Sequence, residues 1–119
     1  MITGTVGDDG LPRITLRLAS RDWPAVIDTG FNGDLELPQT LRQTLQAQPV
    51  GRVTSLLAGG LTVEEDVYLV EITFDGTRLR AEATFVPGAQ ILIATRLLQD
   101  HHLDIEFPSR RVTLARPQD

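Results

Sequence analysis

The chain has 119 residues and a formal net charge of −5; it contains no cysteine, and all eleven of its basic residues are arginine. This length supports a single domain over residues 1–119 with one hydrophobic core. The absence of cysteine excludes disulfides, thiol nucleophiles and cysteine-bound metals, and the absence of lysine excludes Schiff-base chemistry. An acidic chain without clustered cations is a poor partner for nucleic acid.

No part of the sequence indicates a membrane partner. No segment approaches the roughly 20 uninterrupted apolar residues that a membrane-spanning helix needs. Residues 1–8 show no basic leader followed by an apolar stretch, which is the pattern of a signal peptide. We therefore expect a cytoplasmic location.

Apolar residues alternate with polar ones along much of the chain, and glycine and proline interrupt the runs, which is typical of short strands. Eight or so strands are expected, over residues 13–18, 23–27, 34–37, 53–57, 61–74, 77–86, 91–93, 103–107 and 111–114. Turns are expected at 8–10 and 20–22, and Asp75-Gly76 predicts a hairpin. Pro38 suits the first turn of a short helix continuing over 39–45, and 95–99 predicts one helical turn. This pattern indicates an all-β barrel or sandwich-like domain.

The segment that carries chemistry runs from Ala25 to Pro38. In it, Asp28 directly follows an apolar strand and precedes the turn at Gly30. A carboxylate at the end of such a strand is held rigidly beside a core that can desolvate it, and desolvation perturbs a carboxyl pKa. The alternative is a strand that ends in an ordinary turn, because Asp-Thr-Gly alone is a weak signal.

A second apolar element, Ile91 to Leu98, follows about sixty residues later. Together with Val26-Ile27-Asp28-Thr29-Gly30, it makes the chain resemble the retropepsin-like aspartic proteases, in particular a bacterial single-domain branch. The resemblance covers nearly the whole sequence. It implies an all-β fold, a retropepsin-like closed barrel of short strands with one or two short helices.

The resemblance also implies a homodimer, because the sequence contains one Asp-Thr-Gly and no Asp-Ser-Gly. The catalytic pair would be Asp28 from each of two chains. Two such close carboxylates share one proton, as in aspartic proteases generally; the charged one activates a water and the protonated one hydrogen-bonds the scissile carbonyl. Thr29 would hydrogen-bond across the dimer, and Gly30 would offer backbone contacts near the substrate. The implied activity is an aspartic endopeptidase acting on peptide or protein substrates chosen by apolar pockets, with no cofactor and no metal.

A flap is expected by position in the family, over Leu57, Ala58, Gly59, Gly60 and Leu61. Gly59-Gly60 would form a mobile tip, since glycine bends at little cost. Closing the flap would exclude water and align the peptide. An ordinary hairpin turn is an equal interpretation of the same residues.

Position 94 departs from the family, which usually has glycine where this chain has Ala94. One added methyl in a close-packed site can cost about 1–3 kcal/mol or move the backbone. Ala94 therefore motivates an alternative function, a catalytically weak module for dimerisation or peptide binding. A third interpretation is an unrelated small β-barrel in which Asp-Thr-Gly is accidental.

Two charged clusters are weaker candidates. Asp100-His101-His102 with Asp104 could ligate a metal, but adjacent strand residues point to opposite faces, so a solvated turn is favoured. The run 64–66, Glu-Glu-Asp, is expected to be exposed.

Overall fold

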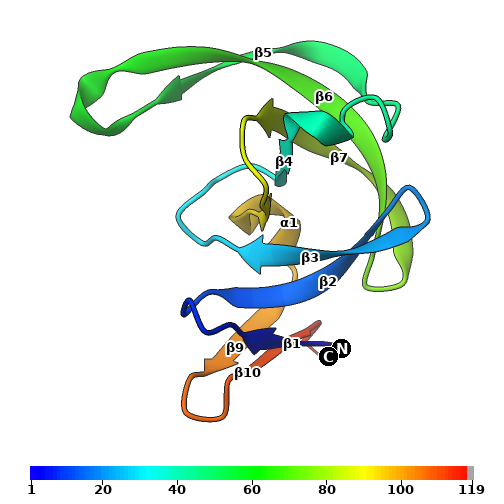
Figure 1. Cartoon of the computed structure of the whole chain (residues 1–119), viewed down its shortest axis with the longest axis vertical. Helices are drawn as coiled ribbons and strands as arrows, with labels where there is room; N and C mark the ends of the chain where they lie inside the picture. The colour runs from blue at the N-terminus through cyan, green and yellow to red at the C-terminus, as the bar shows by residue number, and fades with distance from the viewer. Residues whose placement is uncertain (118–119) are drawn as a thin grey trace.

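The computed structural model describes residues 1–117, and these form ten strands and three short helical segments (Figure 1). The strands are β1 (Ile2–Val6), β2 (Pro12–Leu18), β3 (Arg21–Ile27), β4 (Leu35–Pro38), β5 (Gln48–Leu56), β6 (Thr62–Phe74), β7 (Thr77–Val86), β8 (Ile91–Ile93), β9 (His102–Glu106) and β10 (Arg111–Ala115). The helical segments are the 3-10 turns η1 (Gln39–Leu41) and η2 (Ala58–Gly60) and the single α-helical turn α1 (Thr95–Leu98).

The sheet closes on itself. Its strands follow the order β5-β6-β7-β4-β8-β3-β2-β1-β10-β9, and β6 also pairs with β2, so the six strands from β6 to β2 form a ring. Strands β1, β10 and β9 extend the sheet beyond that ring, near both termini (Figure 1). The predicted all-β fold is confirmed, and the closed barrel that was expected is a ring of strands.

Two pairings in the ring are parallel, β3 with β8 and β4 with β7. In the first, Ile27 lies opposite Ile93, so both strands end at the same edge of the sheet. The residues that follow each strand, Asp28 and Ala94, are therefore neighbours although they are far apart in sequence.

The core fills the interior of the ring, as the alternation in β2 predicts. Its residues Ile14, Leu16 and Leu18 are buried and the intervening Thr15 and Arg17 are exposed. The largest fully buried side chains come from four strands of the ring and from β10 beside it: Leu16, Leu18, Leu35, Leu37, Val70, Ile72, Ile93, Val112 and Leu114. Each such side chain contributes about 1.5–3 kcal/mol through its removal from water.

Several strand boundaries differ from the prediction. Strand β1 was not predicted, because its sequence, ITGTV, contains glycine and few apolar residues. The turn after β2 consists of Ala19 and Ser20, both with positive φ, so Arg21 and Asp22 belong to β3. Such a two-residue turn matches the twist of the flanking strands, and an ion pair between Arg17 and Asp22 spans it.

The predicted helix over 39–45 is wrong. Pro38 is the last residue of β4, and only Gln39–Leu41 form a 3-10 turn. Isolated hydrogen-bonded turns follow, until positive φ at Gln46 ends the segment. So short a segment does not repay the cost of helix nucleation, and no side chain caps its N-terminus. The helical turn predicted at 95–99 is confirmed by α1.

Candidate active site

Asp28 lies where β3 leaves the core. The three residues before it, Ala25 to Ile27, are all buried, and Asp28 itself is half-buried. Its backbone N–H donates to the carbonyl of Ile93 at 2.9 Å, which continues the β3–β8 ladder by one residue. The candidate carboxylate therefore stands on a rigid element.

The turn after Asp28 is organised by its own carboxylate. The N–H of Gly30 donates to Asp28 Oδ1 at 2.9 Å, and the N–H of Phe31 donates to the Asp28 carbonyl at 3.4 Å. A Cβ added at Gly30 would lie 3.3 Å from Asp28 Oδ1, which is a tight contact. Thr29 and Gly30 are exposed, so both are accessible from outside this chain.

The loop beyond the turn is tied down by α1. The N–H and Oγ1 of Thr95 both donate to the carbonyl of Phe31, at 3.0 and 3.1 Å. The N–H of Arg96 donates to the carbonyl of Gly33 at 3.2 Å. The first residues of α1 thus bind the backbone of the loop that carries Asp28.

Ala94 lies fully buried between β8 and α1. Its N–H donates to the carbonyl of Asp34 at 2.9 Å, while the adjacent Ile93 carbonyl accepts from Asp28 at 2.9 Å. Both hydrogen bonds have ordinary lengths. The Ala94 methyl group is therefore accommodated with the bonds that position Asp28 intact.

An ionic network holds the far end of the same loop. Arg96 Nε donates to Asp34 Oδ1 at 2.9 Å and its Nη2 donates to Glu82 Oε2 at 2.6 Å. The other oxygen of Asp34 accepts the N–H of Glu82 at 2.9 Å. The hydrogen bonds of Arg96 to Asp34 and to Glu82 raise its pKa above the usual range, and the bond to Asp34 has the larger effect. The network joins the loop, β7 and α1.

A cleft of about 480 Å³ opens beside this loop. Its lining comes from the loop itself, from β7, from Arg96 and from the inner side of the β5–β6 hairpin: Gly30, Phe31, Asn32, Gly33, Asp34, Leu35, Val53, Thr54, Leu56, Glu65, Val67, Glu82, Ala83, Thr84 and Arg96. Figure 1 shows that hairpin projecting on the same side of the molecule as the loop after β3. The cleft mixes apolar and charged side chains, whereas the sequence predicted selection by apolar pockets.

Negative charge gathers near Asp28. The pKa of Glu36, on β4, is raised first by burial and then by the charges of Glu65 and Asp28. The run 64–66 is thus not uniformly exposed as predicted. Alternation along β6 turns Glu64 and Asp66 outward, where both pair with Arg52, and leaves Glu65 half-buried on the cleft side.

The predicted flap residues form the tip of the β5–β6 hairpin. The N–H of Leu57 donates to the carbonyl of Leu61 at 2.7 Å, and Gly59 and Gly60 both have positive φ. All residues from Leu57 to Leu61 are exposed, and none of them lines the cleft, which the neighbouring Leu56 does. Their role as a flap stays a prediction.

In the cluster at 100–104, Asp100, His102 and Asp104 are exposed, as the favoured solvated turn predicts, but His101 is not. The side chain of His101 is only 2% exposed, because its ring packs edge-on against buried Phe74. Its Nε2 lies 3.2 Å from Asp75 Oδ2. Within residues 1–117, no three His, Cys, Asp or Glu side chains are placed to hold a metal ion. No helix in that range is long and apolar enough to cross a membrane.

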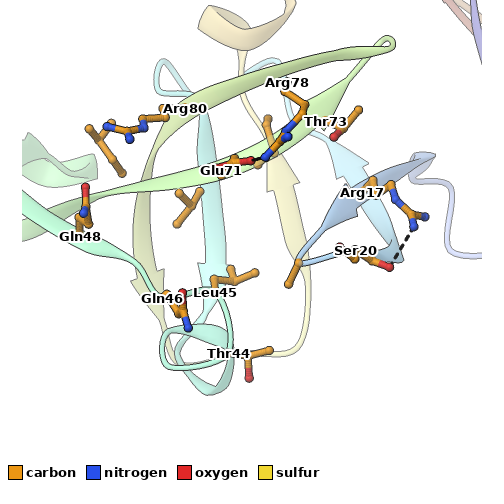
Figure 2. Close-up of a pocket in the computed structure, with 14 residues that line it drawn as sticks. Arg17, Ser20, Thr44, Leu45, Gln46, Gln48, Glu71, Thr73, Arg78 and Arg80 are labelled. Atoms are coloured by element: carbon orange, nitrogen blue, oxygen red, sulfur yellow. Dashed lines mark hydrogen bonds and ion pairs between the residues drawn. The ribbon is translucent and has the colours of Figure 1, made fainter.

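A second cavity, of about 550 Å³, lies away from Asp28 between the β2–β3 turn, the segment after η1 and the β6–β7 hairpin (Figure 2). Its cations are partly engaged. Arg17 donates to the Ser20 carbonyl at 3.0 Å, and Arg78 pairs with Glu71. No residue that lines the first cleft also lines this cavity.

Sequence reasoning placed Asp28, Thr29 and Gly30 in one turn, and the structure brings them together. It missed Arg96 and Glu36 as parts of the site. Arg96 meets Asp34 across 62 positions of sequence, and no local pattern reports such a pair. Alternation in 34–37 did place Glu36 on the face opposite Leu35 and Leu37, but which element covers that face follows from the closure of the ring.

Comparison with solved structures identifies the fold. A retropepsin-like aspartic protease from Rickettsia conorii superposes with a TM-score of 0.66 and 16% identity, over 96% of this chain and 89% of that one. The simian foamy virus protease follows with a TM-score of 0.58 and 17% identity, over 73% of this chain and 91% of that one. The EIAV protease, solved in complex with an inhibitor, gives a TM-score of 0.58 and 17% identity, over 81% and 92%. No protein-family model matches the chain, and no curated protein matches it by sequence. The chain has the retropepsin-like fold.

Proposed function

We propose that this protein is a homodimeric aspartic endopeptidase in which two copies of Asp28, one from each protomer, activate the water that hydrolyses a peptide bond. The observation that carries the proposal is the position of Asp28. Its carboxylate stands at the end of a buried strand, is oriented by the Gly30 N–H and lies in an exposed turn beside a cleft. The structural neighbours, which are aspartic proteases by name, support the same chemistry.

The dimer is required by the chemistry because one chain supplies one such carboxylate. Exposure of Thr29 and Gly30 in the single chain supports a partner at this turn. A two-fold axis there would bring the two Asp28 carboxylates together. Close carboxylates cannot both ionise cheaply, so the pair retains one proton. The ionised member takes a proton from water, and the protonated member donates a hydrogen bond to the scissile carbonyl.

The substrate would be an extended peptide lying in the cleft between the loop 28–34 and the β5–β6 hairpin. Thr29 would hydrogen-bond across the dimer and stiffen both turns. Residues 57–61 would close over the peptide and exclude water.

A diverse peptide library incubated from pH 4 to 8 tests the proposal, with Asp28→Asn as the parallel variant. We expect cleavage by the wild type, faster at mildly acidic than at alkaline pH because the shared proton must be retained, and none by the variant. Cleavage that survives Asp28→Asn would contradict the proposal. A well-folded dimer that cleaves nothing would favour the alternative, a binding module with weak catalysis, and Ala94→Gly would then be the next variant.

A further inference from the structure

Two carboxylates near Asp28, those of Glu36 on β4 and Glu65 on β6, form no ion pair within the described residues 1–117, and of the two Glu65 lines the cleft. Among the residues that line the cleft within the described part of the chain, the one cation is Arg96, and both ends of its guanidinium are occupied by Asp34 and Glu82. Arg96 is therefore already engaged and does not neutralise Glu65. Burial first, and then the negative charges of Glu65 and Asp28, raise the pKa of Glu36.

The strand register fixes the direction of the Glu36 side chain. Glu36 lies opposite Thr84 in the parallel β4–β7 pair and opposite Leu92 in the β4–β8 pair. Paired residues project from the same face of a sheet, so these three side chains share one face, away from the core that Leu35 and Leu37 fill.

An unpaired hydroxyl occupies the same face. Thr84 is 8% exposed and lines the cleft, and its Oγ1 is buried with no hydrogen-bond partner among residues 1–117. A buried polar atom without a partner is costly, and native proteins satisfy nearly all of them. Thr84 Oγ1 thus marks a place where a ligand atom would gain a hydrogen bond.

We propose that Glu36, Glu65 and Thr84 form a subsite for a cationic side chain, arginine or lysine, of the peptide that occupies the cleft. A guanidinium or ammonium group would neutralise the two carboxylates and donate to the Thr84 hydroxyl. Charge-assisted hydrogen bonds of this kind are the strong ones, more so where both partners are partly withdrawn from water. The inference rests on the proposed function for the peptide ligand, and it replaces selection by apolar pockets alone.

A metal ion is the other cation that carboxylates attract. It is disfavoured because no three such side chains within residues 1–117 converge as ligands. Glu36 and Glu65 lie on β4 and β6, the two strands that flank β7 and its Thr84 in the sheet.

Binding tests the subsite without relying on catalysis. The probes are fluorescent peptides that carry arginine at one position in turn, each paired with the same peptide carrying citrulline, a neutral isostere. Anisotropy is measured with the Asp28→Asn protein at pH 7. At one register we expect the arginine peptide to bind about tenfold or more tightly than its citrulline partner, the effect of one charge-assisted contact. Equal binding at every register would overturn the subsite.

One added substitution tests the role of Glu36 in the subsite, and a second serves as its control. Glu36→Gln in the same background should reduce the preference to about threefold or less, and it introduces no new buried charge that would threaten folding. Glu71→Gln is the matched control, because Glu71 lies on β6 like Glu65 but is exposed and pairs with Arg78. An unchanged preference in Glu36→Gln, or an equal loss in Glu71→Gln, would overturn the assignment.

Cleavage by the wild-type protein is scored separately. If peptides are cut without an arginine or lysine preference, the subsite fails and the peptidase stands. If arginine peptides bind selectively and none is cut, the peptidase fails and the subsite stands.

Discussion

Removing the Arg96 guanidinium should loosen the loop that carries Asp28. Arg96→Met keeps most of the apolar stem but loses both ionic contacts. The contact with Asp34 is the stronger one, because the Asp34 side chain is only 15% exposed, and a charge-assisted hydrogen bond there is worth about 1.5–3 kcal/mol. The contact with Glu82 joins side chains that are 44% and 48% exposed, and such pairs contribute at most about 1 kcal/mol.

We therefore expect Arg96→Met to lower the free energy of unfolding by about 2–3 kcal/mol, a fall in Tm of roughly 10 °C for a domain of this size. Urea denaturation at pH 7 and fixed protein concentration measures it. Double-mutant cycles separate the two contacts, and we expect coupling of about 1.5 kcal/mol with Asp34→Asn and below about 0.5 kcal/mol with Glu82→Gln. Equal coupling in the two cycles would refute the argument from burial.

Three further predictions follow from contacts around the site and the sheet. Glu36→Gln should raise stability at pH 7. Because the pKa of Glu36 is raised in the folded protein, its carboxylate destabilises the fold at pH values above the ordinary pKa of glutamate. The stability gained by Glu36→Gln should therefore be smaller in denaturation at pH 4 than at pH 7. Gly30→Ala should lower kcat for peptide cleavage by about tenfold with little change in Tm, because its Cβ would press on Asp28 Oδ1; an unchanged kcat would contradict this. Asp75→Ala should cost about 2 kcal/mol in urea denaturation, because Asp75 has positive φ and faces buried His101, while Asp75→Asn should cost less than half of that. Equal costs for the two Asp75 variants would count against the role of the backbone.

Much of the fold is visible in the sequence because short strands with one buried face impose alternation. The boundaries of β7 and the turn at Asp75-Gly76 were predicted to the residue, since the hairpin needs positive φ at two positions that such residues tolerate. The helix over 39–45 was not, because helix-forming residues without a cap or sufficient length form only turns.

The candidate site could be predicted only where it is local. The turn from Asp28 to Gly30 is contiguous, so its motif identified it. Contacts between Arg96 and Asp34, or between Glu36 and Thr84, exist only because parallel pairing brings β8 beside β3 and β7 beside β4. A single sequence carries no signal for that pairing.

The central claim is that each working site contains Asp28 from two chains. The most direct test mixes a fixed amount of wild-type protein with increasing Asp28→Asn protein, at concentrations where both are dimeric and exchange freely. Random pairing predicts that peptide cleavage falls to about one half at an equal ratio and about one quarter at a threefold excess of the variant. Cleavage that stays constant as the variant is added would show that one chain suffices, and the account would be wrong.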